Sequence, residues 1–152
     1  MNEIVKKKKD LRNKLIERRS LLKKNTTREF NIEAFNKLTE KIELNKVDCV
    51  GSFMSIRSEI STNLLNRAIL DMNKKLAFPL IEKNADTLIF KTTSSDKSFK
   101  LGKFNIPEPT NNNKEIIPQL FFVPCLGFDL KGFRIGYGGG FYDKTFEKLK
   151  KL

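Results

Sequence analysis

Residues 120–143 read LFFVPCLGFDLKGFRIGYGGGFYD and join a continuous apolar run to a glycine-rich stretch. The apolar run at 120–124 is typical of a strand that is buried on both faces of a sheet. Six of the eight glycines lie between positions 127 and 140, and a helix is predicted from 141 to 149. Ligands of open α/β sheets bind at the carboxyl ends of strands, glycines let backbone N–H groups approach a ligand, and a helix N-terminus favours anions. The stretch therefore predicts a site for an anionic ligand.

Apolar residues at helical spacing predict three further helices before this stretch. The first covers residues 3–24, the second follows a Thr26–Glu29 capping box, and the third begins at Ser61 or Thr62. The predicted buried positions are Ile4, Leu11, Leu15 and Leu22 in the first helix, Ile32, Phe35, Leu38, Thr39 and Ile42 in the second, and Leu64, Leu65, Ala68, Ile69 and Met72 in the third.

Short apolar runs predict strands at 47–54, 76–79 and 87–91. Residues 92–118 are polar and loop-rich, with 99–106 as a candidate edge strand. Helices that alternate with buried strands imply an α/β fold with a largely parallel sheet flanked by helices. A chain of about 150 residues is enough for one domain with a real core and rarely for two. We therefore expect residues 1–152 to form a single three-layer α/β domain.

The composition excludes several kinds of site. The chain has no His, which removes His-ligated metal sites, Ser-His-Asp triads and imidazole acid–base catalysis. Cys49 and Cys125 are too far apart in sequence for a CxxC pattern, and two lone thiols fit a reducing compartment. The longest apolar run has nine residues, whereas a membrane-spanning helix needs about 20. Without a signal-peptide pattern at its N-terminus, the protein is expected to be soluble and cytoplasmic.

The net charge of +12 is concentrated at the two ends of the chain. Residues 1–24 carry +7 and residues 144–152 carry +3, which leaves +2 for residues 25–143. A lysine run is usually a solvated helix face, so this pattern alone does not define a site. The more specific interpretation is a polyanionic partner, either a nucleic acid or the phosphates of a nucleotide. Lys8 and Arg12 are four residues apart and so share one face of the first helix.

Two common phosphate-binding loops do not match the glycine-rich stretch. There is no GxxxxGK[ST] sequence, and a GxGxxG loop that starts at Gly136 would need glycine at position 141, which is Phe141. The structural alternative to a ligand site is a tight turn packed under the last helix. Four glycines in five residues, flanked by Arg134 and Asp143, favour the ligand site.

The segment from Pro124 to Asp143 resembles the signature of the 5-formyltetrahydrofolate cyclo-ligase family, in which a proline and an FD pair precede G-x-R-[LI]-G-[YR]-G-x-G-[YF]-Y-D. Two weaker segments agree in the same order. Lys8-Lys-Asp-Leu-Arg12 resembles an N-terminal K-x-x-x-R, and FMSIRSEI at 53–60 resembles a strand followed by a glutamate. The resemblance thus covers nearly the whole chain.

The resemblance implies ATP- and Mg²⁺-dependent conversion of 5-formyltetrahydrofolate to 5,10-methenyltetrahydrofolate. The formyl oxygen is phosphorylated, N10 attacks, and phosphate leaves. Such a reaction needs positioning and charge neutralisation more than a general base, so a protein without His can perform it.

The resemblance also implies three sets of binding residues. Three of the implied residues also have a purely structural interpretation. Asp143 could be an acid favoured by the helix dipole, Glu59 could be a surface acid, and Phe141 could be a core residue. The implied sets are Lys8, Arg12, Arg134, Gly136, Tyr137, Gly138, Gly139, Gly140, Phe141 and Tyr142 for ATP, Met54, Glu59, Tyr137 and Phe141 for the folate, and Asp143 for Mg²⁺.

The chain departs from the family pattern at its end. Family members continue some tens of residues past the glycine-rich motif, adding a strand and a second Mg²⁺-binding aspartate. Because this chain stops at Leu152, we expect it to lack that strand region, with Asp129 as the only nearby substitute for the second aspartate.

One alternative function is a truncated, weakly active or inactive relative that still binds nucleotide or folate. The other is a basic RNA-binding module, which the confinement of charge to the ends disfavours. We expect small-molecule partners, no membrane association and a monomer.

Overall fold

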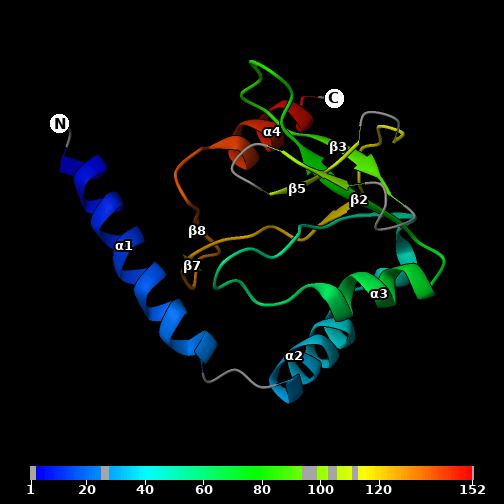
Figure 1. Cartoon of the computed structure of the whole chain (residues 1–152), viewed down its shortest axis with the longest axis horizontal. Coiled ribbons are helices and arrows are strands. Elements are labelled where there is room, and N and C mark those ends of the chain that lie inside the picture. Colours follow the sequence, from blue (N-terminus) through cyan, green and yellow to red (C-terminus); the bar gives the residue numbers. More distant parts are fainter. Residues whose placement is uncertain (1–2, 25–27, 94–98, 103–105, 111–112, 152) are drawn as a thin grey trace.

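The computed structural model describes residues 3–24, 28–93, 99–102, 106–110 and 113–151. Thr26, half of the predicted capping box, lies outside these residues. The helices are α1 (Glu3–Lys24), α2 (Arg28–Lys41), the short 3₁₀ helix η1 (Leu44–Lys46), α3 (Asn63–Asp71) and α4 (Phe141–Leu149) (Figure 1). The strands are β1 (Cys49–Gly51), β2 (Lys75–Leu80), β3 (Ile89–Thr92), β4 (Phe99–Leu101), β5 (Pro107–Pro109), β6 (Leu120–Phe121), β7 (Gly127–Phe128) and β8 (Arg134–Ile135).

The central sheet has the strand order β3-β2-β1-β6. β1 runs parallel to both β2 and β6, and β3 pairs antiparallel with β2 at one edge. Two antiparallel ribbons, β4–β5 and β7–β8, accompany the sheet. This mixed α/β arrangement with a largely parallel sheet confirms the expected fold class.

The two faces of the sheet carry separate clusters of core residues, because successive strand side chains point to opposite faces. Val50 and Leu76 belong to the cluster that packs against α3, where Ile69 is fully buried. Cys49 and Ala77 belong to the other cluster, against which residues of the first turn of α4 pack. Figure 1 shows α2 and α3 on one side of the sheet and α4 on the other. The result is a helix–sheet–helix layering.

The predicted strand at 120–124 is shorter and less buried than its apolar sequence indicates. β6 comprises only two residues, both half-buried. The reason is its position, since it lies at the edge of the sheet and pairs only with β1 among the described strands. β1 is likewise confined to three residues, whereas a strand over 47–54 was predicted.

The predicted apolar stripe of α1 is wrong for most of its length. Ile4, Leu11 and Leu22 are exposed, and only Leu15 is half-buried. α1 lies beside the β7–β8 ribbon (Figure 1) and contacts the rest of the molecule through its middle and, at its C-terminal end, through Lys23, which donates to the carbonyl oxygen of Arg57. Its half-buried face is formed by two cations and two apolar residues, namely Arg12, Leu15, Ile16 and Arg19.

The predicted inner faces of α2 and α3 are largely confirmed. Leu65 and Ile69 are buried, and Ala68 is half-buried. Leu64 and Met72 are more than a third exposed; Leu64 lies in the first turn of α3 and Met72 is its C-cap. In α2, Ile32 is exposed, Thr39 is half-buried, and the residues that pack against the core are Phe35, Leu38 and Ile42. None of the helices in the described part of the chain is long and apolar enough to cross a bilayer.

Candidate functional site

A cavity of about 860 Å³ lies at the carboxyl ends of the three parallel strands. Met54 follows β1, Ile81 follows β2 and Pro124 follows β6, and all three line it. The middle of α1 and the segment from β8 to α4 form further walls. This is where open α/β sheets bind ligands, as the sequence pattern predicted.

The thirteen residues that the family resemblance assigns to ligands all line this one cavity. They come from three stretches of sequence that only the fold brings together. They are Lys8 and Arg12 from α1, Met54 and Glu59 from the loop after β1, and Arg134, Gly136, Tyr137, Gly138, Gly139, Gly140, Phe141, Tyr142 and Asp143 from the glycine-rich segment.

The glycine-rich segment is tied directly to α1. Arg12 Nε donates a 3.0 Å hydrogen bond to the carbonyl oxygen of Gly136. Gly138 adopts φ +107°, and a Cβ at this position would lie 3.3 Å from Arg12 Cζ. Gly140, at φ +72°, is the N-cap of α4. The segment thus places the N-terminus of α4 and the Arg12 cation at one cavity, an arrangement that favours an anion.

We expect Gly138→Ala to lower the free energy of unfolding by about 1–3 kcal/mol, because an L side chain is strained at positive φ and would press on Arg12. Gly132→Ala is the matched control, since Gly132 has φ +83° and a Cβ added there would meet no heavy atom within 4 Å. Urea unfolding of both variants measures the difference. The loss should be larger at Gly138, and the excess should shrink in an Arg12→Ala background. Equal losses at the two glycines would contradict this role for the Arg12 contact.

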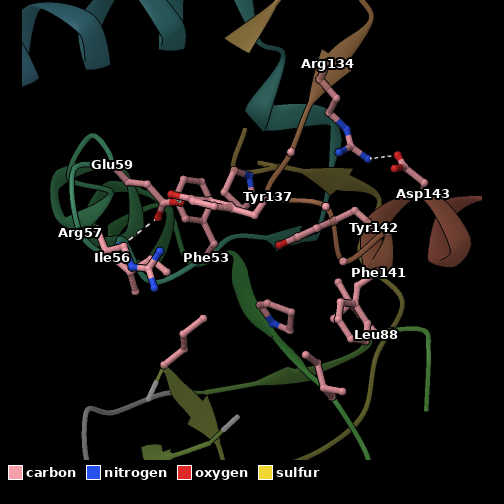
Figure 2. A pocket seen from close by; sticks show the side chains of 18 of the residues that line it. Phe53, Ile56, Arg57, Glu59, Leu88, Arg134, Tyr137, Phe141, Tyr142 and Asp143 are labelled. Carbon is pink, nitrogen blue, oxygen red and sulfur yellow. Dashed lines mark hydrogen bonds and ion pairs between the residues drawn. The ribbon is translucent and has the colours of Figure 1, made fainter. Parts of the chain in front are cut away.

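Asp143 lies in the first turn of α4 and forms an ion pair with Arg134 (Figure 2). The Asp143 side chain is 75% exposed, whereas that of Arg134 is 24% exposed. The Arg134 guanidinium lies over the ring of Tyr142, 5.8 Å from its centroid, and 6.0 Å from that of Phe146. Aromatic packing therefore fixes the arginine, and the arginine holds the carboxylate at the edge of the cavity.

The described residues contain no group of three or more acidic or cysteine side chains that could hold a metal ion. Asp129, the expected substitute for a second carboxylate, does not line the cavity. Its Oδ1 accepts hydrogen bonds of 2.9 Å from the backbone N–H groups of Lys131 and Phe133, which closes the β7–β8 turn. Mg²⁺ is commonly held by one or two carboxylates together with substrate phosphates. A lone Asp143, paired with Arg134 in the first turn of α4, fits that mode.

The loop after β1 is held by its own hydroxyl groups. Thr62 is the N-cap of α3 and is one of the two residues predicted for that position. Its side chain does not cap the helix, because Oγ1 donates a 2.8 Å hydrogen bond to the carbonyl oxygen of Phe53. Ser55 Oγ donates to the carbonyl oxygen of Ile60 at 2.7 Å and accepts from the backbone N–H of Thr62 at 3.0 Å. These bonds fix a compact loop that places Met54 and Glu59 on the cavity wall.

Glu59 is a buried acid, 6% exposed, which excludes the surface-acid alternative. Its Oε2 accepts a 2.9 Å hydrogen bond from the backbone N–H of Ile56, and its Oε1 accepts one of 3.2 Å from the Tyr137 hydroxyl (Figure 2). Burial raises the pKa of Tyr137 above its ordinary value, although the Arg19 guanidinium partly opposes this shift. The phenol therefore stays protonated at neutral pH and donates to the carboxylate.

Phe141 and Tyr142 have both core and cavity roles. Each packs against the cluster around Phe90 on the α4 side of the sheet, and each lines the cavity. The Tyr142 hydroxyl is buried and has no hydrogen-bond partner among the described residues. Burial raises its pKa strongly, so it remains a neutral phenol. Figure 2 shows this hydroxyl pointing toward the side of the cavity where Tyr137 lies.

Three charged residues at or next to the cavity were not predicted as site residues from the sequence. Arg19 lies seven residues after Arg12, so its helical spacing was a usable signal. Arg57 lines the cavity at φ +52°, a conformation that sequence does not reveal for a non-glycine residue. Glu108, buried at 6% exposed, lines the cavity from β5 in a stretch whose prolines indicated only a loop.

Comparison with known proteins agrees with this geometry. Residues 4–152 match the model of the 5-formyltetrahydrofolate cyclo-ligase family. The chain is 32% identical over 111 residues to the 5-formyltetrahydrofolate cyclo-ligase of Haemophilus influenzae, which covers 70% of this chain and 59% of that protein. It thus spans about three fifths of the length of this curated relative.

Two solved structures have the same fold. The NMR structure of the Aquifex aeolicus 5,10-methenyltetrahydrofolate synthetase superposes with a TM-score of 0.78 at 25% identity, covering 92% of this chain and 72% of that one. The 5,10-methenyltetrahydrofolate synthetase of Mycoplasma pneumoniae, at 19% identity, superposes with a TM-score of 0.65 over 95% of this chain and 80% of that one, a likeness of fold. With the match to the family model over residues 4–152, these findings show that the chain belongs to the 5-formyltetrahydrofolate cyclo-ligase family.

Proposed function

We propose that this chain catalyses the ATP- and Mg²⁺-dependent cyclisation of 5-formyltetrahydrofolate to 5,10-methenyltetrahydrofolate. The observation that carries the proposal is the gathering of all thirteen assigned residues, from three separate stretches of sequence, around one cavity of about 860 Å³. Family membership supports the same reaction. The free thiols of Cys49 and Cys125 are compatible with a cytoplasmic location, which we propose together with a monomeric state.

The cavity has two chemically distinct ends. One end combines Lys8, Arg12, Arg134 and the N-terminus of α4, and we assign it to the ATP phosphates. The other end presents the buried Glu59 carboxylate, which we assign to hydrogen-bond donors of the pterin ring. A substrate that spans the cavity would have its reacting formyl group between these ends, within reach of the γ-phosphate.

The cavity wall supplies residue types that match the phosphoryl-transfer step and protect its product. When bound, Mg²⁺ supplies charge neutralisation on the phosphates, and Asp143 is the carboxylate positioned to hold it. Lys8 and Arg12 orient the phosphoryl group toward the formyl oxygen, which becomes phosphorylated with release of ADP. Attack by N10 then closes the ring and expels phosphate. Apolar walls that include Phe53, Ile81 and Leu88 exclude water from the phosphorylated formyl group.

The two alternative functions make different binding predictions. A relative that binds without catalysis would be stabilised by ATP or 5-formyltetrahydrofolate and would form no product. An RNA-binding module would bind RNA with an affinity that falls steeply with salt. Lys8 and Arg12 both line the cavity, and Arg12 is half-buried there, which favours a nucleotide over RNA.

Isothermal titration of the protein with Mg-ATP, with 5-formyltetrahydrofolate and with a single-stranded RNA separates the RNA-binding module from the enzyme and the non-catalytic binder, and formation of the methenyl product separates those two. The proposal predicts saturable one-to-one binding of both small molecules. Tight salt-sensitive RNA binding with no response to either small molecule would refute both the enzyme and the non-catalytic binder.

A further inference from the structure

Arg19 joins three separate walls of the cavity from its position on α1. Its Nε donates a 3.0 Å hydrogen bond to Ser58 Oγ in the loop after β1. Its Nη1 donates a 3.0 Å bond to the carbonyl oxygen of Cys125, which follows β6. Its Nη2 donates to the Tyr137 hydroxyl in the glycine-rich segment. The planar guanidinium, with donors in fixed directions, can satisfy three acceptors at once, which a lysine ammonium on a flexible stem cannot do in this geometry.

The contact with Tyr137 continues to the buried acid. The Arg19 guanidinium lies over the Tyr137 ring, 5.4 Å from its centroid, and its hydrogen bond occupies a lone pair of the phenol oxygen. The phenol proton is thereby directed to Glu59 Oε1 at 3.2 Å. Glu59 Oε2 is fixed separately by the backbone N–H of Ile56 at 2.9 Å. The orientation of the carboxylate thus depends on a hydrogen-bonded series that begins at Arg19.

In this arrangement α1 contacts both ends of the cavity. Its Lys8 and Arg12 face the anion-binding end of the cavity, whereas Arg19, two turns further along, contacts the end that contains Glu59. Arg19 itself is absent from the cavity lining, so it acts on a ligand only through the groups that it holds, Tyr137 and the loop that carries Ser58 and Glu59. The neighbouring Arg18 is exposed and lies on another face of the helix.

We propose that Arg19 is a positioning residue for folate recognition: it fixes Tyr137 and the loop that carries Ser58, so that the Glu59 carboxylate is held in the orientation that binds the pterin. This inference rests on the proposed function, because it assumes that Glu59 contacts the folate. It assigns to Arg19 an effect on the folate substrate and not on ATP.

The kinetic test compares Arg19→Ala and Arg19→Lys with the matched control Arg18→Ala. Losing charge-assisted hydrogen bonds should raise the KM for 5-formyltetrahydrofolate by about 10-fold to 100-fold in Arg19→Ala, with the KM for ATP within about 2-fold of wild type. Arg19→Lys should be intermediate, and Arg18→Ala should match wild type. Because Arg19 and Tyr137 act in series, Tyr137→Phe should add little in the Arg19→Ala background.

A ligand-free measurement checks the Arg19–Tyr137 contact itself. The chain has two Tyr and no Trp, so ultraviolet titration in a Tyr142→Phe background reports Tyr137 alone. The Arg19 cation lowers the pKa of Tyr137, so Arg19→Ala should raise it and reduce the phenolate fraction at a given alkaline pH. The two Tyr137 titrations are compared only over the pH range in which circular dichroism shows that both proteins are folded.

The outcomes separate this inference from the proposed function. If wild type turns over 5-formyltetrahydrofolate but Arg19→Ala leaves its KM unchanged, or raises both KM values equally, the positioning role is refuted and the proposed function stands. An unchanged Tyr137 titration refutes the contact. If wild type neither binds nor converts 5-formyltetrahydrofolate, the proposed function and the inference fall together.

Discussion

Asp143→Ala is expected to remove turnover that depends on Mg-ATP, with a loss of about 10³-fold or more, because a metal-holding carboxylate supports several kcal/mol of transition-state stabilisation. Asp143 is the acidic residue that the structure places beside Arg134 at the start of α4, on the cavity wall. No group of three metal-binding side chains exists among the described residues to take over its role.

The direct measurement is Mg²⁺ dependence, in both turnover and ATP binding. In wild type, Mg²⁺ should strengthen ATP binding. In Asp143→Ala this gain should disappear, while binding of ATP without the metal should be unchanged or stronger, since a negative charge near the phosphates is removed. Asp86→Ala is the control, because Asp86 also forms an ion pair with a residue of α4, Lys144, but does not line the cavity. Normal turnover in Asp143→Ala would remove the metal assignment.

Glu59→Gln is expected to lower kcat/KM for 5-formyltetrahydrofolate by at least about 10-fold to 10²-fold, because each hydrogen bond from the pterin to the charged carboxylate contributes about 1.5–3 kcal/mol. The substitution keeps the shape of the side chain. It replaces an acceptor-only carboxylate with an amide whose NH₂ group would face either the Ile56 N–H or the Tyr137 hydroxyl, both of which donate in the native structure.

Glu59→Gln should affect the kinetics for 5-formyltetrahydrofolate and not the binding of Mg-ATP. The affinity for Mg-ATP should stay within about 2-fold of wild type, because the anion-binding residues belong to other elements of the fold. Glu43→Gln is the control, since the Glu43 side chain is 68% exposed and pairs with Lys46 away from the cavity. A proportionate loss of ATP affinity would mean that Glu59 supports the cavity as a whole, and an unchanged kcat/KM would refute its contact with the folate.

The glycine-rich motif could be interpreted from sequence because its signal is local. The predicted helix over 141–149 coincides with α4, and the segment before it lines the cavity as expected. β2 (Lys75–Leu80) extends the predicted strand by one residue at each end. In both cases residues adjacent in sequence carry the whole pattern, so no knowledge of distant packing was needed.

The orientation of α1 could not be predicted from its apolar residues. Its half-buried face includes Arg12 and Arg19, whose guanidinium groups donate hydrogen bonds to carbonyl oxygens of loops that are distant in sequence. The spacing of apolar residues carries no information about such contacts. The same limit applies to β6, where an apolar sequence indicated burial on both faces and the topology left the strand at an edge. The positions of Arg57 and Glu108 likewise depend on loop and ribbon geometry that only tertiary structure fixes.

The central claim is that this chain, which spans about three fifths of its Haemophilus relative, forms a working cyclo-ligase site. The most direct test is the absorbance of the 5,10-methenyl product when the purified protein is mixed with 5-formyltetrahydrofolate, ATP and Mg²⁺. We predict product formation that requires all three components and is lost in Asp143→Ala. Folded wild-type protein that binds both substrates and forms no methenyl product would contradict the claim.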